Sequence, residues 1–173
     1  MPLRAVMFGH SYGGSTAVNV AAQDARVVAA VDMDGTPYPP VANATMRKPV
    51  LLMQSGQNSP ATWNYTLVHS INFAAFYAYH VSGWKTWVRL DDAAHYSFTD
   101  LPLLADLVGL RGNGLSEELL GTVNSRRMLE TVWRYTQEFF AYLLRNETSD
   151  LLGGPRAEFP DVQFVGHAEA GKN

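Results

Sequence analysis

A serine flanked by glycines lies between a segment patterned like a buried strand and a segment patterned like a helix. Residues 4–9 are mostly apolar and end in glycine, residues 9–13 read Gly-His-Ser-Tyr-Gly, and residues 13–23 are rich in small side chains. This order predicts a sharp strand-to-helix turn with Ser11 at its tip. We expect neither flanking glycine to tolerate a Cβ atom, because that atom would collide with neighbouring backbone. The chain must therefore adopt a fold in which a strand leads directly into a helix that packs on the sheet.

The rest of the chain alternates between strand and helix patterns. Strands are expected at 26–31, 49–53 and 84–90, the last near a sheet edge, and helices at 61–80 and 125–145, before an extended tail over 151–173. Strands alternating with helices indicate an α/β fold with a mostly parallel sheet wrapped by helices. We expect one domain over 1–173. Because few strands are present and the first begins close to Met1, we expect that domain to be partial, truncated on its N-terminal side.

Composition excludes several classes of partner and site. The 173 residues carry a formal net charge of −3 with no basic cluster, which argues against nucleic acid. The chain has no cysteine, and no apolar run approaches the roughly 18 residues of a transmembrane helix. We predict neither a metal nor a cofactor.

Three N-x-[ST] sequons begin at Asn43, Asn64 and Asn146. They hint that the parent protein is secreted. The N-terminus itself lacks the apolar segment and cleavage site of a signal peptide.

A nucleophilic serine needs a histidine base. His95 lies in the loop 91–98 directly after a predicted strand, where the carboxyl edge of a parallel sheet places such a base, and we assign it that role. The other histidines fit less well. His10 lies inside the turn and is expected to point away from the base position, and the remaining three lie in an aromatic helical stretch or a polar tail: His69, His80 and His167.

The histidine in turn needs an orienting carboxylate. The loop 54–60, where this acid most often lies, contains amides and no carboxylate. Asp34 ends the preceding strand and is our candidate, whereas Asp32 is expected on the opposite face in a structural role. Asp91 and Asp92 are close to the histidine in sequence, but carboxylates in such positions usually decorate a loop surface.

The backbone N–H of Tyr12, one residue after the serine, is the expected donor to an oxyanion. The order serine, aspartate, histidine is that of the α/β-hydrolase fold.

Three segments together resemble the platelet-activating factor acetylhydrolase family of the plasma (isoform II) type and its microbial relatives. They are residues 9–14 (Gly-His-Ser-Tyr-Gly-Gly), 32–36 (Asp-Met-Asp-Gly-Thr) and 94–102 (Ala-His-Tyr-Ser-Phe-Thr-Asp-Leu-Pro). The resemblance runs from about residue 4 to residue 165 and covers only the C-terminal part of those proteins. It implies a calcium-independent esterase that removes short acyl groups from the sn-2 position of phospholipids, with the acid after the earlier strand. It also implies that the second oxyanion donor belongs to a loop before residue 4.

Two alternatives stay open. The first is another carboxylesterase or a polyester hydrolase on the same fold, although the catalytic carboxylate of such enzymes usually lies in the loop that here holds Gln57 and Asn58. An inactive fragment that lacks the second oxyanion donor is the other.

Overall fold

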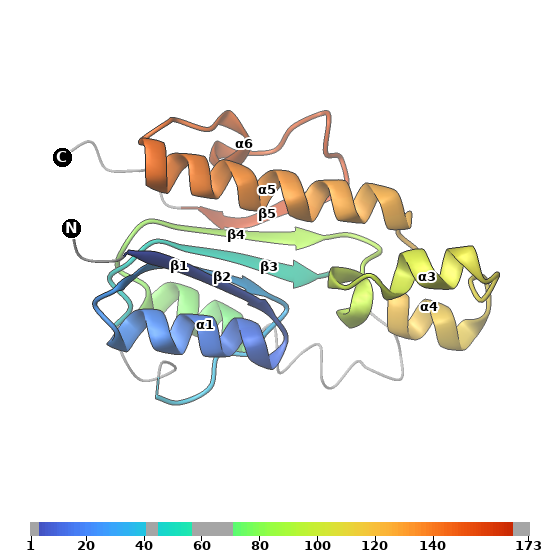
Figure 1. The fold of residues 1–173 in the computed structure, drawn as a ribbon, viewed down its shortest axis with the longest axis horizontal. Helices are drawn as coiled ribbons and strands as arrows, with labels where there is room; N and C mark the ends of the chain where they lie inside the picture. Colours follow the sequence, from blue (N-terminus) through green and yellow to red (C-terminus); the bar gives the residue numbers. More distant parts are fainter. Residues whose placement is uncertain (1–3, 41–44, 57–70, 168–173) are drawn as a thin grey trace.

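A mostly parallel sheet forms the centre of the molecule (Figure 1). The computed structural model describes residues 4–40, 45–56 and 71–167. Within these residues the sheet has five strands in the order β1-β2-β3-β4-β5, and the first four run parallel. They are β1 (Ala5–His10), β2 (Val27–Met33), β3 (Val50–Ser55), β4 (Lys85–Leu90) and the antiparallel β5 (Val162–His167).

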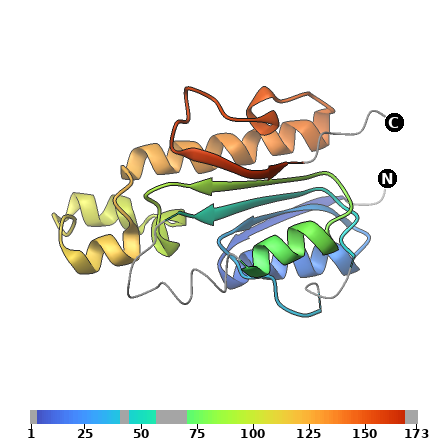
Figure 2. The same cartoon turned by 180° about the vertical axis from the view of Figure 1, so that it is seen from behind.

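Helices cover both faces of the sheet, as parallel strands buried on both sides require (Figures 1 and 2). On one face, α1 (Tyr12–Gln23) and the helical residues 71–75, continued by the π-helical turn η2 (Phe76–His80), pack over Ala30 and Leu52. On the other, α5 (Ser125–Arg145) and α6 (Asp150–Gly153) enclose Leu51 and Val88. Alternate residues along the four parallel strands thus contribute to two separate apolar clusters.

A third group of helices lies beyond the carboxyl ends of the parallel strands (Figure 1). It consists of the short 3₁₀ helix η3 (His95–Phe98), α3 (Leu101–Leu107) and α4 (Gly114–Leu120). The strand register aligns these ends, because His10 pairs with Met33, Met33 with Met53, and Ser55 with Leu90. Segments that leave the four strands therefore meet at one edge.

The sequence predicted most of these elements. The expected helix 125–145 matches α5, and strands lie within a residue or two of the expected ranges. The strand expected near a sheet edge at 84–90 is β4, which lies next to the edge strand β5. One expectation needs correction: the segment 151–173, expected to be an extended tail, supplies most of α6 and all of β5. The part of the predicted helix 61–80 before residue 71 lies outside the described residues. Across the described ranges, no helix is both long and apolar enough for a membrane crossing.

Candidate active site

Ser11 occupies the turn between β1 and α1 in a backbone conformation that side chains rarely adopt. Its φ is 58° and its ψ is −128°, a strained combination that costs about 1–3 kcal/mol. Three backbone hydrogen bonds hold it there: the Ser11 N–H donates to the Met33 carbonyl at 2.8 Å, and the N–H groups of Gly14 and Ser15 donate to the Ser11 carbonyl at 2.9 and 3.2 Å. The strain presents the hydroxyl at the carboxyl edge of the sheet.

The two glycines that flank this turn differ in what surrounds them. A Cβ atom on Gly9 would lie 2.5 Å from the carbonyl carbon of Gly13 and 2.7 Å from its oxygen, so the first glycine is sterically required. A Cβ on Gly13 would meet nothing within 4 Å among the described residues. The expectation that neither position tolerates a side chain is therefore wrong for the second glycine, which points into open space at the start of α1.

His95 lies between the serine and Asp34. Its Nε2 is 2.9 Å from Ser11 Oγ, and its Nδ1 is 2.7 Å from Asp34 Oδ2. An ionised carboxylate can only accept hydrogen bonds, so Nδ1 carries the proton and donates to Asp34. The remaining nitrogen, Nε2, then accepts from the serine hydroxyl. The structure thus brings together the three side chains that the sequence singled out, in the predicted order.

Asp34 is itself firmly held. It has a left-handed φ of 56°, and its side chain is 1% exposed. Its N–H donates to the Met53 carbonyl at 2.7 Å, and its Oδ1 accepts from both the N–H of Ser55 at 2.8 Å and the hydroxyl of Ser55 at 2.9 Å. The end of β3, which lacks a carboxylate, thus supports the carboxylate supplied by β2. Sequence reasoning missed Ser55, because a lone serine after a strand carries no signal of such a role.

His10 contacts the far side of His95, contrary to the expectation that it points away. Its Nε2 lies 2.8 Å from the main-chain carbonyl oxygen of His95, to which it donates, and the two rings are 4.6 Å apart between centroids. Burial lowers the pKa of His10, and the neighbouring His95 lowers it further, outweighing the opposing hydrogen bond and the more distant Asp34. The residue before the serine therefore braces the loop that carries the candidate base.

The other side of that loop is held by the end of α4. Ser97 Oγ donates to the Leu120 carbonyl at 2.8 Å, and the N–H groups of Thr122 and Val123 donate to the Asp92 carbonyl at 2.9 and 3.1 Å. His95 is thus fixed from two directions by main-chain and side-chain hydrogen bonds.

The alternative aspartates lie elsewhere. Asp91 forms an ion pair with Arg89 at 3.5 Å. Asp92 has a left-handed φ of 61°, and its main-chain carbonyl accepts the two hydrogen bonds from the segment after α4. Asp32 is fully buried, and its Oδ1 accepts from the Gly35 N–H at 2.8 Å. Of the remaining histidines, His80 ends η2, His167 ends β5, and His69 lies outside the described residues.

Tyr12 is the first residue of α1, so its N–H has no intrahelical acceptor and lies beside the serine. The helix dipole places partial positive charge at the same point. Tyr12 itself is 76% exposed. These features suit the N–H for contact with a developing negative charge.

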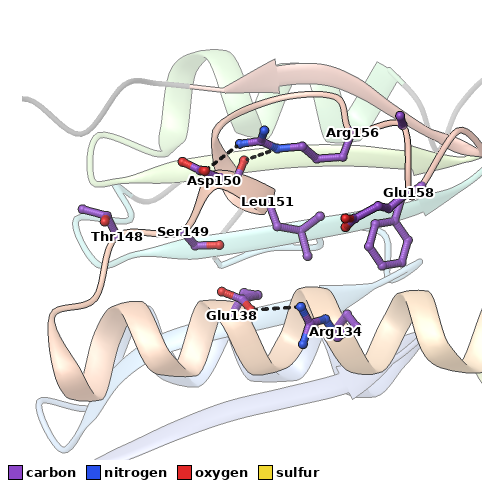
Figure 3. A pocket seen from close by; sticks show the side chains of 10 residues that line it. Arg134, Glu138, Thr148, Ser149, Asp150, Leu151, Arg156 and Glu158 are labelled. Atoms are coloured by element: carbon purple, nitrogen blue, oxygen red, sulfur yellow. Dashed lines mark hydrogen bonds and ion pairs between the residues drawn. The ribbon is translucent and has the colours of Figure 1, made fainter.

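Two pockets lie apart from these residues. One, of about 560 Å³, lies between α5 and residues 148–159, where Arg134 pairs with Glu138 at 3.7 Å and Arg156 with Asp150 at 3.3 Å (Figure 3). The other, of about 410 Å³, lies between α3 and α4 and is lined mainly by leucines. Neither contains a residue of the Ser11 site. No cluster of three metal-ligating side chains occurs in the ranges that the structure describes.

Comparison with known proteins identifies the family. The family described as "Platelet-activating factor acetylhydrolase, isoform II" matches residues 2–142. The chain belongs to this family. The match confirms the resemblance carried by the three sequence segments around Ser11, Asp34 and His95.

Two individual relatives of this acetylhydrolase-family chain extend the comparison. A curated protein of Arthroderma benhamiae, "Probable 1-alkyl-2-acetylglycerophosphocholine esterase", is 29% identical over 165 residues, which are 92% of this chain and 42% of that protein. The solved ferulic acid esterase from Streptomyces cinnamoneus is 33% identical with a TM-score of 0.77, over 92% of this chain and 46% of that one. The structural match confirms the α/β-hydrolase fold, and the chain spans less than half the length of either relative.

Proposed function

We propose that the protein carrying this chain is a serine esterase that cleaves carboxylic esters through an acyl-enzyme on Ser11. The observation that carries the proposal is the position of His95, with Nε2 2.9 Å from Ser11 Oγ and Nδ1 2.7 Å from Asp34 Oδ2. Both distances are those of hydrogen bonds that can transfer and orient a proton. The family, and two relatives whose names are those of esterases, support the same reaction.

In the proposed mechanism, His95 Nε2 takes the proton of the serine hydroxyl as Oγ attacks the ester carbonyl carbon. The carbonyl oxygen becomes an oxyanion that accepts a hydrogen bond from the Tyr12 N–H. His95 then gives its proton to the departing alkoxide, leaving the acyl group on Oγ. Water, deprotonated by the same histidine, attacks that acyl group; the bond from the acyl carbon to Ser11 Oγ then breaks, the histidine returns the proton to Oγ, and the acid is released. Asp34 holds the ring in the required tautomer and stabilises the imidazolium throughout.

The substrate class that we favour is a short acyl ester, above all the sn-2 acetyl group of a phospholipid of the platelet-activating-factor kind. The family and the name of the Arthroderma relative support this choice. A second candidate is the ester of an aromatic acid, supported by the 33% identity to the ferulic acid esterase. The exposed Tyr12 and Tyr96 beside the site offer ring surfaces on which an aromatic acyl group could stack.

Labelling by a fluorophosphonate tests the reaction itself. One equivalent should be incorporated, and Ser11→Ala should abolish labelling. His95→Ala and Asp34→Asn should each lower kcat about 10³-fold or more with the fold retained. An unlabelled, folded protein would favour the alternative of an inactive fragment without its second oxyanion donor.

A substrate panel separates the two ester classes. We would compare p-nitrophenyl esters from acetyl to octanoyl, methyl ferulate, and a phospholipid with an sn-2 acetyl group. A kcat/KM that falls steeply beyond a few acyl carbons supports the short-acyl assignment. Preference for methyl ferulate supports the aromatic one, and equal activity on long chains contradicts both.

A further inference from the structure

Asp32 is a buried carboxyl group that the proposed reaction does not use. It lies on β2, is 0% exposed, and faces the α1 side of the sheet. Burial raises the pKa of this group well above its ordinary value, the Gly35 N–H opposing the rise and the nearby Asp34 adding to it. A buried carboxyl is costly to keep, so its presence beneath the site requires a reason.

Its contacts connect the two turns that carry Ser11 and Asp34. One oxygen, Oδ1, accepts from the Gly35 N–H at 2.8 Å, closing the turn in which Asp34 has its left-handed φ of 56°. A Cβ atom added to Gly14 would lie only 2.1 Å from the same oxygen, so the carboxyl group packs directly against this glycine. The carboxyl therefore touches the turn of the candidate acid on one side and the first turn of α1, directly after the serine, on the other.

Gly35 completes this junction. A Cβ atom there would lie 2.2 Å from the Ser11 carbonyl oxygen and 2.4 Å from Asp32 Oδ1. Three backbone segments thus meet around one carboxyl group with no room for another side chain. Any group that replaced this carboxyl without an acceptor oxygen would leave the buried Gly35 N–H unpaired and free the turn to relax.

We propose that Asp32 is a positioning residue that locks the turn bearing Asp34 against helix α1, and so sets the distances from His95 to Ser11 and to Asp34. The inference rests on the proposed esterase function. Asp32 touches no reacting atom in this scheme. It acts through Asp34, whose left-handed backbone conformation it stabilises by accepting the Gly35 hydrogen bond.

The test compares Asp32→Leu, which has a similar shape but no acceptor, with Asp32→Asn, which keeps the acceptor oxygen. Thr86→Val serves as the control, because Thr86 is equally buried, lies on β4, and donates its hydroxyl hydrogen bond to the carbonyl of Leu152, which is not part of the Ser11 site. Each variant is measured for melting temperature, for kcat per fluorophosphonate-titrated site, and for the downfield proton resonance of the His95 Nδ1–H that faces Asp34.

Asp32→Leu should lower kcat per titrated site about 10-fold to 100-fold, change KM by less than about 2-fold, and shift or remove the resonance. Asp32→Asn should keep kcat within about 3-fold and retain the resonance, and Thr86→Val should change only the melting temperature. An unchanged kcat and resonance in folded Asp32→Leu would overturn the inference. If that variant does not fold, a large loss of both in folded Asp32→Asn would overturn it equally. An unreactive wild-type protein would contradict the esterase proposal, and the resonance would still report on positioning.

Discussion

Alanine at the two glycines of the turn should have opposite consequences. The Cβ of Gly9→Ala would lie 2.5 Å from the Gly13 carbonyl carbon, about 0.9 Å inside the 3.4 Å at which ordinary contact begins. Both partners are backbone, so the turn must move by nearly that amount. A shift of about 1 Å at Ser11 would stretch the 2.9 Å hydrogen bond to His95 beyond useful length. We expect kcat/KM to fall about 100-fold and stability to fall by about 1–3 kcal/mol.

Gly13→Ala is the matched control. Its Cβ meets nothing within 4 Å in the described part of the chain, and alanine favours a helix over glycine by about 0.5–1 kcal/mol. Activity should stay within about 2-fold, with a slightly raised melting temperature. The assay is hydrolysis of p-nitrophenyl acetate with active-site titration and thermal unfolding for each variant. Normal activity in Gly9→Ala, or a dead but folded Gly13→Ala, would refute the steric argument.

Further predictions concern the groups around the candidate base and acid. His10→Leu should lower kcat about 10-fold, because the bond to the His95 carbonyl is lost, and His10→Gln, which can restore a donor, should recover most of it. Because folding lowers the pKa of His10 from 6.5, the unfolded chain binds more protons than the folded chain just below that pH. The free energy of unfolding should therefore fall on acidification, and it should fall less in His10→Gln. Urea titrations at pH 5 and 7 check this. Ser55→Ala removes one donor to Asp34 but leaves the backbone N–H, so kcat should fall by about 10-fold or less. The raised pKa of Asp32 means that the folded chain holds a proton above pH 3.8 that the unfolded chain has lost, so the free energy of unfolding should decline as the pH rises from 3.8 through the folded pKa. Asp32→Asn should abolish this contribution to the slope, which urea titrations at a series of pH values above 3.8 would measure.

The sequence predicted the parts of the site that local patterns specify. Ser11 stands in a pattern whose turn and helix are both encoded within about ten residues, and His95 follows a strand directly. Asp34 was reached by elimination, since the loop after the next strand contains no carboxylate. That elimination assumes that consecutive strands lie side by side, which is the commoner arrangement in such sheets.

What the sequence did not reveal depends on contacts between distant segments. The bond from His10 to the His95 carbonyl joins residues 85 positions apart, and β5 pairs with β4 across more than 70 residues. The spacing of apolar residues says which face of a strand is buried, but not which strand is its neighbour. The support of Asp34 by Ser55 and the open surroundings of Gly13 likewise emerge only from the packed backbone.

Each of the four parallel strands ends by delivering one group to the same small volume: Ser11 after β1, Asp34 after β2, Ser55 on β3 and His95 beyond β4. A slip of one residue in any strand would displace its group by about 3.3 Å, more than these hydrogen bonds tolerate. Reactivity at the serine consequently depends on the register of all four parallel strands. During refolding, the appearance of a labelled Ser11 would mark the moment at which all four strands have aligned, whereas spectroscopic signals of strand or helix content would rise earlier.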